Sequence, residues 1–174
     1  MQLDQAMLDA VRQYFAALTR DITLVLAPGA HEKRDELKAF LTQIVSTSPR
    51  LHLEEAADPA LTTPISFILR ADGTDTGIIF TGIPGGHEFT SLILAILQAG
   101  GSALKLDDSI QALIRNIQQP LHFTTYISLS CHNCPDVVQT LNQFALLNPQ
   151  IRSEMIDGGL FQEQIEAHNI QGVP

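Results

Sequence analysis

Hydrophobic positions in the first hundred residues alternate between helical spacing and short runs of β-branched or aromatic residues. The helical spacing predicts a first helix over residues 3–18, a second whose apolar positions run from Leu37 to Val45, and a third from Phe89 to Leu97. The short runs predict strands at residues 22–26, 51–54, 65–69 and 77–80, with a hairpin signal at Asp72-Gly73. The stripe expected to be buried on the first helix consists of Met7, Ala10, Val11, Tyr14 and Leu18.

This order of elements predicts a thioredoxin-like unit. A parallel pair of strands comes from the β-α-β portion, and an antiparallel hairpin precedes the last helix, which Gly100-Gly101 closes. Residues 1–101 complete the arrangement. A linking helix is predicted within residues 102–120, with one apolar face formed by Ile110, Leu113, Ile114 and Ile117.

After the link the pattern begins again. A strand is predicted over residues 123–130, a turn over 131–134, a helix with its apolar stripe from Val137 to Ala145, a strand over 151–156 and a short helix over 160–168. Residues 121–174 therefore read as a second thioredoxin-like unit that lacks its C-terminal strands and helix. The predicted fold class is α/β, with two fused thioredoxin-like units whose mixed central sheets are flanked by helices.

Two structural expectations follow from this organisation. Units of this size are too small to be robust alone, so we expect them to share one continuous sheet or a broad interface. An incomplete second unit is also expected to expose a sheet edge and an apolar face near Leu129 and Ile156. Such a chain should form a homodimer or be cut by proteases after residue 120.

Composition narrows the class of partner. The 174 residues carry 10 Lys and Arg against 19 Asp and Glu, a formal charge of −9, with 45% hydrophobic residues. Nucleic acid and anionic membranes bind clustered basic residues, which this chain lacks, so neither is an expected partner. The N-terminus has no basic region followed by an apolar stretch, and no run is long enough to span a bilayer, so a cytoplasmic location is expected.

The two cysteines carry the chemistry. Cys131 and Cys134 form a CxxC motif at a predicted strand-to-helix turn, where backbone N–H groups and the positive helix end face the first sulfur. CxxC motifs at helix starts have a lowered thiol pKa and supply a nucleophile at neutral pH. We therefore expect Cys131 to attack a disulfide and Cys134, one turn further in, to resolve the product.

Other interpretations of the same residues stay open. CxxC is also half of a zinc site, with His122 and His132 near in sequence, and two small cysteines are sometimes passive. His132 either holds the thiolate by its charge or is a solvated surface residue. Glu88 follows Gly85-Gly86-His87 and is most simply a first-turn acid that favours a helix start.

Pro174 is a further candidate site residue. Thioredoxin-like folds place a proline, usually with a cis peptide bond, opposite the CxxC turn, where it shapes the groove for an extended partner chain. The first unit has Pro28-Gly29-Ala30-His31 at the position of the CxxC turn, so it carries no dithiol.

Three segments resemble one known family. The run from Tyr126 to Gln139 that contains Cys-His-Asn-Cys-Pro-Asp, the later Ile156 to Gly159 with Gly172-Val173-Pro174, and Ile83 to Phe89 are similar to the F subunit of bacterial alkyl hydroperoxide reductase. The resemblance covers that family's N-terminal region, two fused thioredoxin-like units of which only the second holds a dithiol. It also implies a supporting role for Glu88, because the family keeps an acid at this position.

The resemblance implies a redox function. A portion similar to thioredoxin reductase, which binds FAD and NADH and lies outside this segment, would pass electrons to Cys131 and Cys134, and these would reduce the disulfide of a peroxiredoxin. No cofactor or metal is expected within the segment itself. The alternative from a different class is a non-catalytic docking module that only positions redox partners.

Overall fold

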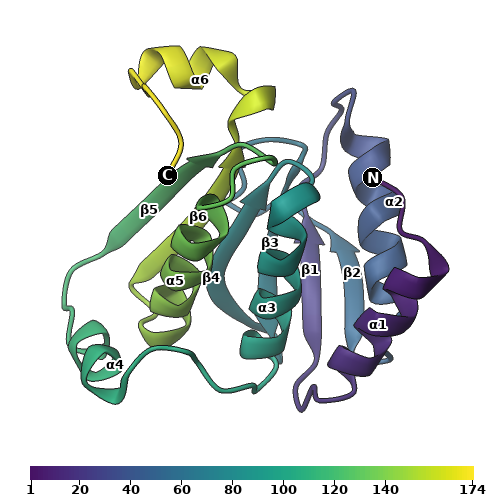
Figure 1. Ribbon diagram of the computed structural model, residues 1–174, viewed down its shortest axis with the longest axis horizontal. Coiled ribbons are helices and arrows are strands. Elements are labelled where there is room, and N and C mark those ends of the chain that lie inside the picture. The colour runs from purple at the N-terminus through teal and green to yellow at the C-terminus, as the bar shows by residue number, and fades with distance from the viewer.

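The computed structural model describes residues 1–174, and its helices and strands follow the predicted order (Figure 1). The elements are α1 (Gln5–Phe15), β1 (Ile22–Leu26), α2 (Arg34–Val45), β2 (Leu51–Glu55), β3 (Ser66–Ala71), β4 (Thr74–Thr81), the 3-10 helix η1 (Gly86–Glu88), α3 (Phe89–Ala99), α4 (Asp108–Arg115), β5 (Leu121–Ile127), α5 (Cys134–Leu147), β6 (Ile151–Asp157), the 3-10 helix η2 (Gly158–Leu160) and α6 (Gln162–Ala167). The predicted α/β fold class with thioredoxin-like units is confirmed.

All six strands form one sheet in the order β2-β1-β3-β4-β6-β5. Strands β1 and β2 are parallel, whereas β3 is antiparallel to both β1 and β4, as the β-α-β and hairpin portions predict. Asp72 and Gly73 form the hairpin turn with φ of 48° and 81°. Positive φ at both positions matches the twist of the flanking strands, and Asp-Gly is a favoured pair there.

The two units join through the parallel strands β4 and β6, where Ile78 pairs with Ser153 and Thr81 with Ile156. The expectation of a continuous sheet is therefore confirmed. Gly77 lies at the start of this junction with φ of 76°, and a Cβ there would lie 2.6 Å from the carbonyl oxygen of Ile151. Only glycine allows β4 to approach β6 so closely.

The junction also corrects one expectation. Ile156 is not part of an exposed apolar face: it is 4% exposed, and Leu129 is half-buried. The prediction assumed that β6 would be left without a neighbour, but β4 of the first unit pairs with it on one side and β5 on the other. The free edge of the second unit is β5, at the end of the sheet.

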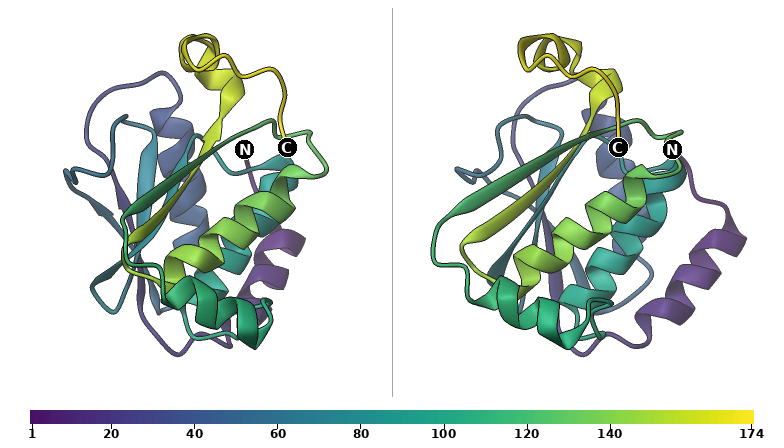
Figure 2. Two further views of the ribbon diagram at one scale, coloured as in Figure 1. Left: turned by 90° about the vertical axis from the view of Figure 1, so that its left-hand side faces the viewer. Right: turned by 60° about the vertical axis from the view of Figure 1, so that its left-hand side comes forward.

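The helices α1, α2, α3 and α5 lie on one face of the sheet (Figure 2). Strand residues alternate between the two faces, so Leu24, Phe67 and Phe80 enter the main core while Ile68 and Ile79 belong to a small cluster on the other face. The segment between β2 and β3 contributes Ala60 to that cluster. Helices α3 and α5, one from each unit, pack against each other, so the core is continuous across the junction.

The apolar stripe predicted for the first helix is only partly buried. Helix α1 runs from Gln5 to Phe15 and is shorter than predicted at both ends; the Asp4 side chain sets its start by accepting a hydrogen bond from the Met7 backbone N–H at 2.8 Å. Tyr14, predicted to be buried, is 60% exposed, and Phe15 takes its place in the core because it lies one turn after Val11.

The linking helix also buries less than expected. In α4, Ile114 is buried, but Leu113 is 65% exposed and Ile110 is 39% exposed. The helix has eight residues and packs only against α5, where the Asn148 side chain donates hydrogen bonds to the carbonyls of Ile114 and Ile117. One neighbour covers one narrow side of a helix. No helix of the structure has the length and apolar character needed to cross a membrane.

A shared sheet and core predict a single cooperative unfolding transition. The chain has two tyrosines, Tyr14 in the first unit and Tyr126 in the second, so each unit has its own probe. In urea, the ring resonances of both tyrosines should lose their native positions with the same midpoint. Two separated midpoints would show that the β4–β6 junction does not couple the units.

Candidate functional site

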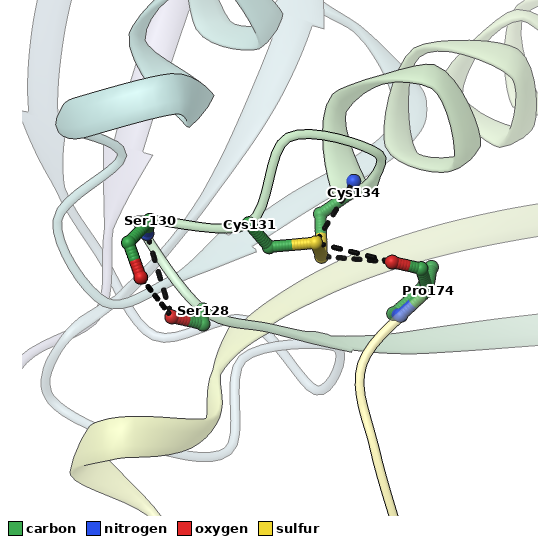
Figure 3. Close-up of a disulfide and its surroundings, with 5 residues drawn as sticks. All are labelled: Ser128, Ser130, Cys131, Cys134 and Pro174. Carbon is green, nitrogen blue, oxygen red and sulfur yellow. Dashed lines mark hydrogen bonds between the residues drawn. A yellow bond between two sulfur atoms is a disulfide. The ribbon is translucent and has the colours of Figure 1, made fainter.

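The CxxC motif lies where β5 passes into α5, at the carboxyl end of the strand (Figure 3). Ser128 to Asn133 form a short connection in which the Cys131 N–H donates to the carbonyl of Ser128 at 3.0 Å. Cys131 and Cys134 are joined by a disulfide, with their Cα atoms 5.5 Å apart. This separation is typical of protein disulfides.

The two sulfurs have different surroundings. Cys134 is the first residue of α5 and is fully buried, whereas Cys131 precedes the helix and is partly exposed. The Cys134 backbone N–H lies 3.1 Å from the Cys131 sulfur, in position to donate to it. The helix start therefore directs an N–H group and its positive end at the more accessible sulfur, an arrangement that stabilises a thiolate there.

Pro174 lies next to the disulfide. Its carbonyl oxygen is 3.1 Å from the Cys131 sulfur and 3.9 Å from the Cys134 sulfur (Figure 3). The peptide bond before Pro174 is trans in the structure.

A loop of the cysteine-free unit reaches the dithiol site. The His87 N–H in η1 donates to the carbonyl of Leu129, two residues before Cys131, at 3.0 Å. Gly86 has φ of 53°, and a Cβ at this position would lie 2.6 Å from the same carbonyl oxygen. Glycine is therefore required for this contact between the units.

Glu88 follows in the same loop and is completely buried. Neither of its carboxyl oxygens has a hydrogen-bond partner. The nearby Ser91 hydroxyl instead accepts from the Gln139 side chain of α5 at 3.2 Å. Burial raises the pKa of the Glu88 carboxyl, because the charged form loses hydration that the nearby Ser91 hydroxyl offsets only in part.

The raised pKa gives a test by stability. Folded Glu88 keeps its proton to higher pH than the unfolded chain does, so the free energy of unfolding falls as pH rises from the unfolded pKa through the folded one. Each unit of pKa difference is worth about 1.4 kcal/mol above both values. The stability of Glu88→Gln relative to the parent should therefore be greater at pH 7 than at pH 4. The thermal unfolding midpoints of both chains at the two pH values measure this difference.

The matched control for that measurement is Glu32→Gln, which makes the same substitution at an exposed glutamate. Its midpoints should follow the parent at both pH values. If the thermal midpoint of Glu88→Gln changed between pH 4 and pH 7 as much as that of the parent, the description of Glu88 as a buried, desolvated carboxyl would be contradicted. Asp157 also has a pKa raised by burial, so part of the pH dependence should remain in every variant.

His122 and His132, which are near in sequence, lie at different places in the structure. His132 contacts His87, with ring centroids 4.4 Å apart, whereas His122 lies beside Glu154, with Nε2 3.4 Å from a carboxylate oxygen. His122 is thus engaged on β5 and β6, away from the CxxC turn. Sequence reasoning missed His87 as a site residue. The two glycines before it were the available signal, because they allow a close backbone approach.

The first unit keeps the shape of a CxxC turn without its sulfurs. At Gly29, in the turn that corresponds to the dithiol, φ is 118° and a Cβ would lie 2.9 Å from the Pro64 ring. Pro64 therefore faces this turn much as Pro174 faces Cys131. The same supersecondary arrangement occurs twice, once with and once without a dithiol.

Known proteins share this sequence and fold. The NTD_N/C domain of alkylhydroperoxide reductase AhpF from Enterococcus faecalis is 33% identical, with a TM-score of 0.90 over 99% of this chain and 88% of that domain. The chain belongs to the AhpF family, the F subunits of alkyl hydroperoxide reductase. It matches the N-terminal domain of AhpF, so the resemblance seen in the sequence is confirmed.

The curated relatives are longer than this chain. The F subunit of alkyl hydroperoxide reductase in Staphylococcus aureus is 45% identical over 94% of this chain and 31% of its own length. A Bacillus subtilis protein named NADH dehydrogenase is 40% identical over the whole chain and 34% of its own length. The chain thus spans about a third of these curated relatives. No family model matches it.

Proposed function

We propose that this AhpF domain is a thiol-disulfide carrier, in which Cys131 and Cys134 take two electrons from a flavoprotein portion and give them to the disulfide of a peroxiredoxin. The observation that carries the proposal is the disulfide at the start of α5, with one buried and one accessible sulfur. The name of the Staphylococcus aureus relative, a component of a hydroperoxide reductase, supports peroxide detoxification as the purpose.

The reaction has two exchange steps. The Cys131 thiolate attacks one sulfur of the partner disulfide, which forms a mixed disulfide and releases the other partner sulfur as a thiolate that takes up a proton. Cys134 then loses its proton and attacks the Cys131 sulfur. The intramolecular disulfide forms, and the second partner thiol leaves. The partner gains two electrons, and the dithiol is oxidised.

Three other residues support this reaction. The Pro174 carbonyl borders the sulfurs and forms one wall of the space that a partner chain would enter. His132 supplies positive charge beside the Cys131 thiolate when it is protonated. The buried carboxyl of Glu88 lies in the loop whose His87 N–H donates to the Leu129 carbonyl. Protonation of Glu88 is therefore coupled to the packing behind the CxxC turn.

Regeneration of the dithiol requires a donor outside this chain. FAD and NADH would bind the remaining two thirds of a protein such as the relatives, because this chain has no glycine-rich dinucleotide motif to hold them. The name NADH dehydrogenase for one relative supports NADH as the source of electrons. A reducing compartment such as the cytoplasm suits a dithiol that must be kept reduced.

A reconstituted assay tests the proposal. The flavoprotein portion of the Staphylococcus aureus relative, with FAD bound, is mixed with this chain, a peroxiredoxin, a hydroperoxide and NADH. NADH oxidation should depend on this chain and rise with its concentration. If the rate stays the same when the chain is omitted, the carrier role is wrong.

A further inference from the structure

Two histidines from different units meet beside the dithiol. His87 belongs to η1 of the cysteine-free unit, and His132 lies between the two cysteines. Their ring centroids are 4.4 Å apart, and the ring planes are inclined by 58°. Both side chains are exposed to solvent, so burial does not force them together.

The backbone on each side fixes this contact. His87 is held by its own N–H on the Leu129 carbonyl, at 3.0 Å, and by the close approach that Gly86 permits. His132 lies within a turn held by the Cys131 N–H on Ser128 and by the contact of the Cys134 N–H with the Cys131 sulfur. Because both turns are fastened to the end of β5, these bonds hold the backbones of the two histidines close enough for their rings to meet.

We infer that His87 is a positioning residue for His132, and through it for the thiolate of Cys131. The inference rests on the proposed carrier function, since it concerns the reactivity of the same dithiol. A protonated His132 in contact with the neutral ring of His87 gains the attraction of a cation for an aromatic ring.

That charge lies next to the nucleophile. His132 follows Cys131 directly in the sequence, so an imidazolium there favours the Cys131 thiolate over the thiol. Without His87, the His132 ring loses its partner and is free to turn toward solvent. The cysteine-free unit thus supplies a side chain that tunes a dithiol it does not contain.

Other charged groups lie in the same region and set the background. Glu88 follows His87 in η1, Asp136 lies in the first turn of α5, and a pocket that Gly86 and Leu129 help to line contains further groups from the start of α2 and the end of β6. These further groups are Lys33, Glu36 and Asp157. All of them are kept unchanged in the variants below, so a difference between variants reports the histidine contact.

The test is the pH profile of Cys131 alkylation in the reduced chain, with thermal midpoints recorded to show that each variant is folded. His87→Ala should react about threefold more slowly at pH 6, the size expected of an exposed cation–ring contact, and its profile should move to higher pH. His87→Phe keeps an aromatic ring and should restore most of the rate. His52→Ala, an exposed histidine on β2 at the far edge of the sheet, should match the parent.

The background variant His132→Ala completes the design. If His87 acts through His132, then His87→Ala should have no further effect on a chain that already carries His132→Ala. A full slowing in that background, or a parent-like profile in His87→Ala alone, would overturn the inference. If the parent chain reduces no peroxiredoxin but the profiles differ as expected, the carrier function fails and the positioning role stands.

Discussion

Cys134→Ser is expected to stop the reaction at its midpoint, as a covalent complex between this chain and its partner. Cys131 would still attack the partner disulfide, but no thiol would remain to release the product, so the mixed disulfide should accumulate. Cys131→Ser should form no complex and transfer no electrons. Non-reducing gel electrophoresis and mass analysis after mixing with an oxidised peroxiredoxin measure both outcomes.

The same roles should appear in alkylation rates of the reduced parent chain. A thiol of ordinary pKa, ~8.5, is only a few per cent thiolate at pH 7, whereas one near ~7 is about half ionised, so the nucleophile should react more than tenfold faster. We expect that preference at Cys131, which is accessible and faces the helix start, over the fully buried Cys134. Faster alkylation of Cys134 would reverse the assigned roles.

Phe80→Ala is expected to have the largest effect on stability. Phe80 is fully buried on β4, its ring stacks on Phe67 with centroids 5.3 Å apart, and it pairs with Met155 across the junction of the two units. Removing a buried phenylalanine side chain costs about 3–5 kcal/mol. That is a large fraction of the ~5–15 kcal/mol by which typical proteins are stable. Urea unfolding should show this loss at both tyrosine probes together.

Leu113→Ala is the matched control, because it also removes a large apolar side chain but from the exposed side of α4. Its change in the free energy of unfolding should stay within about 0.5 kcal/mol. Destabilisation at Tyr14 alone in Phe80→Ala would mean that the second unit does not depend on β4. A loss in Leu113→Ala comparable to that in Phe80→Ala would mean that α4 packs differently from the described structure.

The element order was predictable because it depends on local patterns. The short apolar runs in β1 and β4 and the helical spacing in α2 place in the core the same residues that the sequence indicates. The pairing of β4 with β6 joins segments far apart in the chain. Nothing local specifies such a pairing, and for that reason the exposure of Ile156 was predicted wrongly.

The features of the candidate site were likewise predictable where they are local and not where they depend on contacts between the units. The spacing of Cys131 and Cys134 at a strand-to-helix turn predicted where the disulfide lies, because the helix start is a local feature. The contact between His87 and His132 depends on how one unit is fastened to the other, so the sequence alone did not indicate it.

Thiol counting tests the central claim most directly. The chain is fully reduced, freed of reductant and mixed with an excess of oxidised peroxiredoxin, and the free thiols on each protein are then counted by alkylation and mass analysis. The carrier account predicts that each chain loses two thiols, at Cys131 and Cys134, and that the peroxiredoxin gains two. A chain that binds the peroxiredoxin but keeps both thiols would contradict it and would leave the docking module as the function.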